Sequence, residues 1–170
     1  MIRYVKKEIL KGSVAMKYSM QFSDAIHILT YIEIYKNTDL LSSEMIAKSV
    51  ETNPANIRKI MSQLKKSGLI ITQVGKPNPT LAKSPEAITL LDVYKSIEGN
   101  TNLIQIDPKT NPNCIVGANI QAVLNEKYDA LQKKVEEEMK EITLDTLIHQ
   151  IAKLELQKRP ENKAFLESFI

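Results

Sequence analysis

Apolar residues recur every three or four positions in three successive stretches of the first part of the chain. This spacing predicts three short helices, over residues 21–35, from Ser42 or Ser43 to residue 50, and from Asn53 to Gly68. Either serine can cap the second helix. Asn53-Pro54 is an N-cap followed by proline at the first helical position, and Gly68 is a typical C-terminal stop. The pattern therefore predicts three helices joined by short turns.

The period changes after Gly68. Residues 69–74 are short and rich in β-branched side chains, residues 75–79 are dense in Gly and Pro, and residues 80–82 can form a returning strand. Three helices followed by a strand, a turn and a strand are the order of a winged helix-turn-helix domain. We expect this domain to cover residues 16–99.

The second part of the chain is helical again. Thr89 and Asp92 have the spacing of a capping box, which opens a helix that ends at Gly99. After a polar connection over residues 100–116, a long helix is predicted from Gly117 to about Ile142, and Thr143 can cap a last helix. The unit after the connection covers residues 117–157, and residues 158–170 are expected to be frayed. The long helix carries a stripe close to a coiled-coil seam, which we expect to pair two chains: Ile120, Leu124, Tyr128, Leu131, Val135 and Met139.

Taken together, the patterns predict a mostly α fold with a small β wing, in which a winged helix-turn-helix domain precedes a long C-terminal dimerisation helix. No apolar run reaches the roughly 18 residues that a membrane span needs. The single cysteine excludes an internal disulfide framework and any metal site built from several thiolates, and it fits a reducing cytoplasm. We therefore expect a cytoplasmic protein without metal or cofactor.

The charge is unevenly distributed along the chain. Residues 1–83 have 13 basic and 6 acidic side chains, whereas residues 84–170 have 10 basic and 14 acidic ones. Residues 53–83, which cover the third helix and the wing, contain six basic side chains and no acidic one. A solvated helix face is the simpler interpretation, but a run free of acids in this position favours DNA binding. The predicted DNA contacts are Ser43, Thr52, Asn53, Asn56, Arg58, Lys59, Lys65, Lys66 and Lys76.

Several stretches together resemble one family of bacterial regulators. The stretches are Met16-Lys17-Tyr18-Ser19, Ala25-Ile26-His27-Ile28-Leu29, Ser43-Glu44-Met45-Ile46-Ala47, Thr52-Asn53-Pro54, Ile57-Arg58-Lys59, Leu64-Lys65-Lys66-Ser67-Gly68-Leu69, Ile88-Thr89-Leu90-Leu91-Asp92-Val93-Tyr94, Glu98-Gly99, Asn111-Pro112-Asn113-Cys114, Val116-Gly117 and Ile120-Gln121. In order and spacing, the chain is similar to the Rrf-two family of winged-helix transcription regulators. The resemblance implies a DNA-binding homodimer and is greatest to the branch that lacks a metal cluster.

The chain departs from that family pattern in two places. The family often has a Gly-Gly wing, whereas this chain has Gly75-Lys76-Pro77-Asn78-Pro79, so Lys76 is the best remaining wing donor. Cluster-binding members have three closely spaced cysteines before the long helix, whereas this chain has only Cys114. An iron–sulfur cluster held within one chain is therefore not expected.

Cys114 has two interpretations. A thiol near a helix N-terminus has a lowered pKa, which would make Cys114 a candidate redox sensor. The alternative, which we weigh somewhat higher, is a small buried residue that anchors the loop. Of the two histidines, His27 is predicted to pack in the core and His149 to lie at the surface or an interface. No nucleophile–base set or phosphate-binding glycine loop is present, so the chain is not predicted to be an enzyme.

The first fifteen residues are interrupted by charges and lack the apolar segment of a signal peptide. We expect residues 1–15 to be an over-called or non-native leader, with Met16 as the natural start.

These inferences combine in one functional prediction: a homodimeric transcriptional regulator, expected to be a repressor, that binds a near-palindromic duplex operator, with Cys114 as a candidate thiol sensor. Two alternatives stay open. One is a winged-helix module that binds an acidic protein partner, and the other is a regulator with a small-molecule pocket and no redox sensing.

Overall fold

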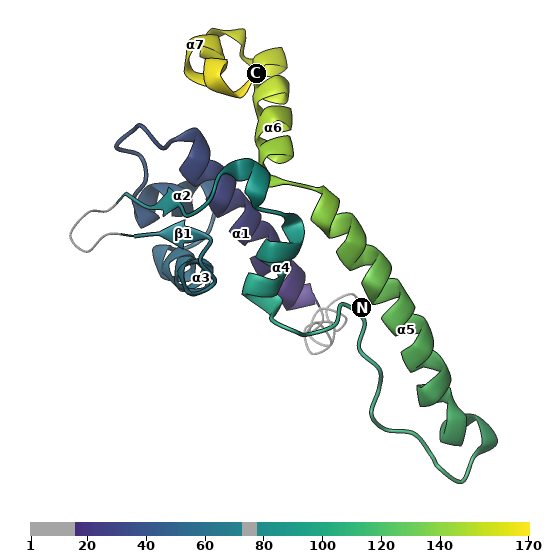
Figure 1. Ribbon diagram of the computed structural model, residues 1–170. Coiled ribbons are helices and arrows are strands. Elements are labelled where there is room, and N and C mark those ends of the chain that lie inside the picture. The colour runs from purple at the N-terminus through teal and green to yellow at the C-terminus, as the bar shows by residue number, and fades with distance from the viewer. Residues whose placement is uncertain (1–15, 73–77) are drawn as a thin grey trace, which may run out of the picture.

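The computed structural model describes residues 16–72 and 78–170, and its first three helices form a helix-turn-helix unit (Figure 1). They are α1 (Met16–Ile34), α2 (Ser43–Val50) and α3 (Pro54–Lys66). The Ser42 side chain caps α2 by accepting the Met45 backbone N–H at 3.2 Å, and Asn53 caps α3 by accepting the Asn56 N–H at 2.8 Å. These starts confirm the predicted caps. The expectation that Met16 is the natural start concerns residues 1–15, which lie outside the described residues.

A two-stranded wing follows α3. Gly68 has a positive φ of 70°, a conformation that suits glycine and turns the chain out of the helix. β1 (Ile70–Ile71) then pairs antiparallel with β2 (Thr80–Leu81), with Ile70 opposite Leu81. The tip of the predicted wing, including Lys76, lies outside the described residues.

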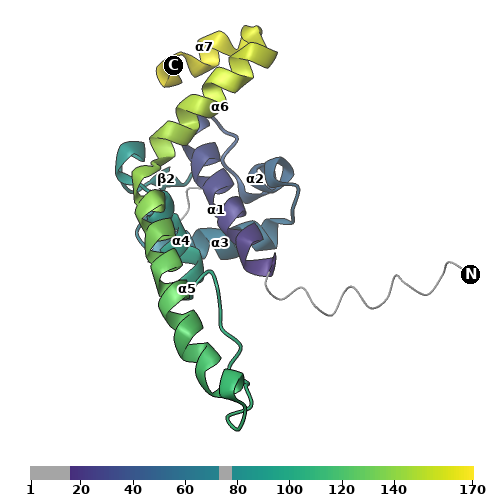
Figure 2. The ribbon, with the colours of Figure 1, turned by 90° about the vertical axis from the view of Figure 1, so that its right-hand side faces the viewer.

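The second half contains a short helix, a long helix and a C-terminal helix. A short turn of 3-10 helix, η2 (Pro85–Ala87), leads into α4 (Leu90–Glu98), which has the predicted Thr89–Asp92 capping box and ends at Gly99. α5 (Ile115–Glu141) begins two residues earlier than predicted, and Thr143 caps α6 (Leu144–Lys158) as predicted. α5 projects from the body beside the connecting loop, whereas α6 lies at the opposite end (Figure 2).

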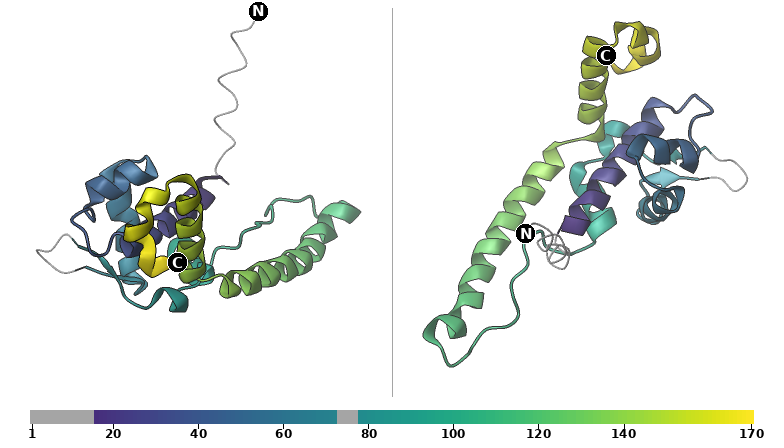
Figure 3. Two further views of the ribbon diagram at one scale, coloured as in Figure 1. Left: turned by 90° about the horizontal axis from the view of Figure 1, so that it is seen from above. Right: turned by 180° about the vertical axis from the view of Figure 1, so that it is seen from behind.

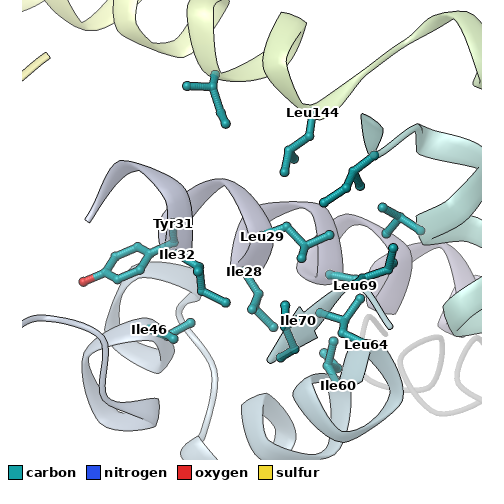
Figure 4. Packing of buried hydrophobic residues seen from close by; sticks show 14 of the residues in the cluster. Ile28, Leu29, Tyr31, Ile32, Ile46, Ile60, Leu64, Leu69, Ile70 and Leu144 are labelled. Carbon is teal, nitrogen blue, oxygen red and sulfur yellow. The ribbon is translucent and has the colours of Figure 1, made fainter. Parts of the chain in front are cut away.

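One hydrophobic core joins the winged-helix domain to α6. Figure 4 shows Ile28 of α1 on the side of Ile60 and Leu64 of α3, and Leu144 of α6 on the other side, above Leu29. Ile32 of α1 lies next to Ile46 of α2. Backbone hydrogen bonds fix this arrangement, since the Leu144 N–H donates to the Ile88 carbonyl at 2.8 Å. The start of α6 is therefore part of the domain body.

The C-terminal residues correct one expectation. Residues 158–170 were predicted to be frayed, but they form η3 (Pro160–Asn162), α7 (Lys163–Leu166) and η4 (Glu167–Phe169), which lie over the body (Figure 3). Leu166 and Phe169 are buried in the core cluster. The Phe165 ring packs against Tyr35 of α1 with 5.4 Å between ring centroids. Three spaced apolar residues thus hold this short segment against the body. Because they do not follow a helical repeat, the spacing of apolar residues did not predict this packing.

Candidate nucleic-acid interface

α3 separates its apolar residues from its basic ones. Ile57, Ile60 and Leu64 are completely buried. The basic side chains on the other side are exposed, and they comprise Arg58, Lys59, Lys65 and Lys66. Because the apolar stripe is held in the core, these four cations face solvent without an acidic residue on α3 itself.

The polar residues at the start of α3 are engaged with one another. Asn53 uses its side-chain oxygen as the N-cap, and the Asn56 amide donates to the Thr52 hydroxyl at 3.3 Å. Burial raises the pKa of Asp24 on α1, and the charge of His27 and a hydrogen bond from the Asn56 side chain oppose this rise only in part. Thr52, Asn53 and Asn56 therefore set the shape of this turn, and Asn56 is half-buried. Their predicted contacts with DNA stay predictions.

Arg58 forms an ion pair that sequence reasoning missed. Its guanidinium Nη2 lies 2.6 Å from Oε1 of Glu44 in the first turn of α2, and both side chains are exposed. The Ser43 hydroxyl donates to the same carboxylate oxygen at 3.2 Å. The pKa of Glu44 is lowered mainly by its own backbone N–H and by Ser43, with Arg58 contributing less. Any anion that binds Arg58 must therefore compete with Glu44.

A hollow of about 400 Å³ lies between the start of α2, α3 and the base of the wing. Arg58 and Lys65 line it from α3, Ser43 and Glu44 from α2, and Thr72 from the wing. Three of the predicted contacts, Ser43, Arg58 and Lys65, thus line one hollow. Lys59 and Lys66 are exposed on α3 but do not line it. The exposed cations along α3 are arranged so that they could contact successive phosphates of a nucleic-acid backbone.

The predicted seam of α5 is only partly covered by the rest of the chain. The helix has no fully buried residue, and the exposed fractions of Leu131 and Val135 are 47% and 38%. Ile120, Leu124, Tyr128 and Met139 are half-buried.

Cys114 is the N-cap residue of α5, and its side chain is exposed. The interpretation of Cys114 as a buried loop anchor is therefore wrong. The nearby backbone N–H groups of Gly117 and Val116, at the start of α5, lower the pKa of the thiol. Gly117 is required here because a Cβ would overlap the Asn111 carbonyl oxygen.

The histidines differ in their surroundings. His27 was predicted to pack in the core, but it is half-buried at the core margin, where its Nε2 lies 2.8 Å from the Ser49 hydroxyl of α2. His149 is exposed on α6, and its Nδ1 lies 3.2 Å from Oδ1 of Asp145.

Comparison with known proteins gives the family. The model of the Rrf2 family, described as an iron-dependent transcriptional regulator, matches residues 18–150. The chain belongs to the Rrf2 (Rrf-two) family. YwnA of Bacillus subtilis (strain 168), assigned as an HTH-type transcriptional regulator, is 36% identical over 75% of this chain and 93% of its own length.

Solved structures agree with this membership. A crystal structure assigned to a DNA binding protein is 35% identical, with a TM-score of 0.61 over 75% of this chain and 98% of the other. CymR, the global cysteine regulator of B. subtilis, is 18% identical with a TM-score of 0.56 over 75% and 92% of the two chains, which shows a shared fold. The Rrf2 chain described here is thus a DNA-binding transcriptional regulator with a winged-helix fold, and the family is one of regulators rather than enzymes.

The iron in the family description does not fit this member's donor set. The whole sequence has one cysteine, and residues 16–72 and 78–170 contain no group of three or more His, Cys, Asp or Glu that could hold a metal ion. The described residues therefore offer no donor set for iron. Within the same residues, no helix is long and apolar enough to cross a membrane.

Proposed function

We propose that this Rrf2 regulator is a homodimeric repressor that binds a near-palindromic duplex operator in the cytoplasm, where bacterial DNA lies. The observation that carries the proposal is the exposed cationic face of α3, next to the hollow at the start of α2. Lys and Arg release counterions from phosphates, and Arg can read guanine in the major groove.

The proposed contacts divide by chemistry. Arg58 and Asn56 are offered as base-reading or phosphate-positioning residues near the N-terminal half of α3, which is where recognition helices usually enter the groove. Lys59, Lys65, Lys66 and Lys76 supply charge. Ser43 lines the same hollow as Arg58 and Lys65. The Thr52 hydroxyl and the Asn53 side-chain NH2 are donors that suit phosphate oxygens.

A second copy is proposed along α5. Leu131 and Val135 are large apolar side chains that the chain itself leaves exposed, and the remaining seam residues are only half-buried. Pairing two such seams across a twofold axis would bury them and set two α3 helices at half-sites about one helical turn or more apart.

A gel shift on duplex from the gene's own upstream promoter, repeated over a range of salt concentrations, tests DNA recognition. Arg58→Ala should weaken binding by about 1–3 kcal/mol if Arg58 reads a guanine. Lys153→Ala, which removes an exposed cation on α6, is the control. Equal loss on random DNA would demote Arg58 to a phosphate contact, and no binding at low salt would contradict the proposal.

Sedimentation equilibrium tests the dimer. Val135→Arg should yield monomers, whereas Val123→Arg, a valine of the same helix that is exposed and off the seam, should leave the dimer intact. Monomers in the wild type, or equal effects of the two variants, would contradict pairing through this seam.

A second candidate function is control by thiol oxidation. It is supported by the exposure of Cys114 and by the two backbone N–H groups that lower its thiol pKa. Hydrogen peroxide, which oxidises the single Cys114 thiol to a sulfenic acid and is itself reduced to water, should change promoter binding by the wild type and leave Cys114→Ser unaffected. If both proteins respond alike, Cys114 is not the sensor.

A further inference from the structure

The cations of α3 differ in their surroundings. Among the described residues, none of Lys59, Lys65 and Lys66 forms an ion pair, whereas Nη2 of Arg58 lies 2.6 Å from Oε1 of Glu44. The exposed fractions of the Arg58 and Glu44 side chains are 61% and 57%. An ion pair this open to water contributes little to the stability of a fold. The pairing of the one arginine on α3 therefore needs an explanation other than stability.

The Glu44 carboxylate is anchored on its own helix. Glu44 lies in the first turn of α2, which the Ser42 side chain caps. The Ser43 hydroxyl donates to Oε1 of Glu44, the same oxygen that accepts from Arg58. α2, α3 and the wing lie together on one side of the body (Figure 1), and both members of the ion pair line the hollow between them. A fixed carboxylate thus holds the Arg58 side chain at this hollow.

The ion pair leaves most of the Arg58 guanidinium available. A guanidinium has several N–H donors in one plane, and in the part of the chain that the structure describes Arg58 uses only Nη2, toward Glu44. Two parallel N–H groups are enough for the O6 and N7 acceptors of guanine. Because guanine is neutral, it can accept these hydrogen bonds while the carboxylate keeps its own.

A phosphate is received differently. It is an anion, and Glu44 already neutralises the charge of Arg58 and repels a second anion. Arg58 therefore releases fewer counterions on binding a phosphate than an unpaired cation would. The lysines of α3 have no such carboxylate among the described residues, so they supply the attraction to any duplex. The ion pair thus separates base reading from general attraction to DNA.

We propose that Glu44 is a positioning residue for base readout, which holds Arg58 ready for a guanine and reduces its attraction to phosphates. The result is a higher ratio of promoter affinity to random-duplex affinity, without any contact between Glu44 and DNA. This role rests on the proposed function, because it requires Arg58 to enter the major groove. It goes beyond that function by assigning specificity to a residue of α2, outside the helix that reads the bases.

The test is a competition gel shift that measures affinity for the upstream promoter and for random duplex at one salt concentration. In Glu44→Gln, which keeps the size of the side chain, random-duplex affinity should rise a few-fold and promoter affinity should fall. The ratio of the two affinities should therefore fall about fivefold or more. Glu51→Gln is the matched control, because Glu51 is an exposed carboxylate at the other end of α2 and its ratio should stay at the wild-type value. Thermal unfolding checks that the variants fold alike.

The variant Arg58→Met shows whether the effect acts through Arg58. In that background, Glu44→Gln should leave the ratio unchanged, because no guanidinium remains to be positioned. An unchanged ratio in Glu44→Gln alone, or an equal fall in Glu51→Gln or in the Arg58→Met background, would overturn the role of Glu44 and leave the proposed function standing. A wild type that binds the promoter no better than random duplex would contradict the proposed function and this role together.

Discussion

α3 and α5 carry similar apolar stripes, but only the stripe on α3 is buried within the chain. Ile57, Ile60 and Leu64 are fully buried in α3, whereas α5, twice as long, has no fully buried residue. The connecting loop covers one flank of α5 through hydrogen bonds of 2.9 Å from the Leu103 N–H to Gln132 and from Gln121 to the Asp107 carbonyl. A helix with its other flank open gains little packing energy from its own chain.

The difference separates two sources of stability. The winged-helix body is stabilised by the contacts of one chain, so its stability should not depend on protein concentration. The α5 seam can gain stability only when another surface covers it, so its contribution should vary with concentration. Variants in the two stripes can therefore break or sharpen this comparison.

The largest expected effect is in the α3 stripe. Ile60→Ala should lower the free energy of unfolding by about 2–5 kcal/mol, because it leaves a cavity among fully buried side chains. Leu131→Ala should cost little at high dilution and more as the protein concentration rises. Denaturant unfolding at several concentrations measures both. Equal, concentration-independent losses would mean that the two stripes do not differ in this way.

Gly117→Ala tests the joint between the loop and α5. Alanine is the better helix residue by about 1 kcal/mol, yet its Cβ would overlap the Asn111 carbonyl oxygen. We expect a local cost of about 1–3 kcal/mol, typical of overpacking, measured as faster hydrogen exchange over residues 107–121 with the body unchanged.

Ala118→Ser, at the next and exposed position, is the control for this variant. Slower exchange in Gly117→Ala would show that helix propensity outweighs the close approach.

The sequence predicted the local features of the fold better than the contacts between distant segments, because of the range of the interactions involved. Caps such as Asn53 and the Thr89–Asp92 box are local, so spacing alone reveals them. The Glu44–Arg58 pair joins residues fourteen positions apart, and it forms only because α2 packs on α3. No residue pattern within α2 or α3 alone predicts this ion pair.

The hollow between α1, α6 and the C-terminal segment escaped prediction for the same reason. Its walls come from α1 and from the C-terminal segment, whose Leu166 and Phe169 lack a helical repeat, and that segment was expected to be frayed. His27 lies between two isoleucines and therefore looked like a core residue, although its Nε2 lies 2.8 Å from the Ser49 hydroxyl of α2. The exposed seam of α5 was predictable, because a long amphipathic repeat is a property of one helix.

A smaller effect is expected on the cationic face. Glu44→Gln removes the charge that Arg58 must leave before it can bind an anion. Affinity for random duplex should rise a few-fold, and the salt dependence should steepen by about one phosphate contact. Glu126→Gln, which removes an exposed carboxylate on α5, is the control. Weaker binding to random duplex by Glu44→Gln would show that Glu44 orients Arg58 rather than competing for it.

The smallest expected effect is a pH dependence of the body that α5 does not share. Burial lowers the pKa of His27 from its ordinary 6.5, and the carboxylate of Asp24 opposes this only in part. Below about pH 6.5, His27 binds a proton in the unfolded chain but stays neutral in the folded chain. The free energy of unfolding should therefore decrease as the pH is lowered, until His27 is also protonated in the folded chain. The measurement is denaturant unfolding from pH 7.5 to 5.5, over which His27→Gln should lose less stability than the wild type. His149→Gln, which removes an exposed histidine, is the control and should decline as the wild type does. If His27→Gln keeps the full decline, the decline does not arise from the desolvated ring between α1 and α2.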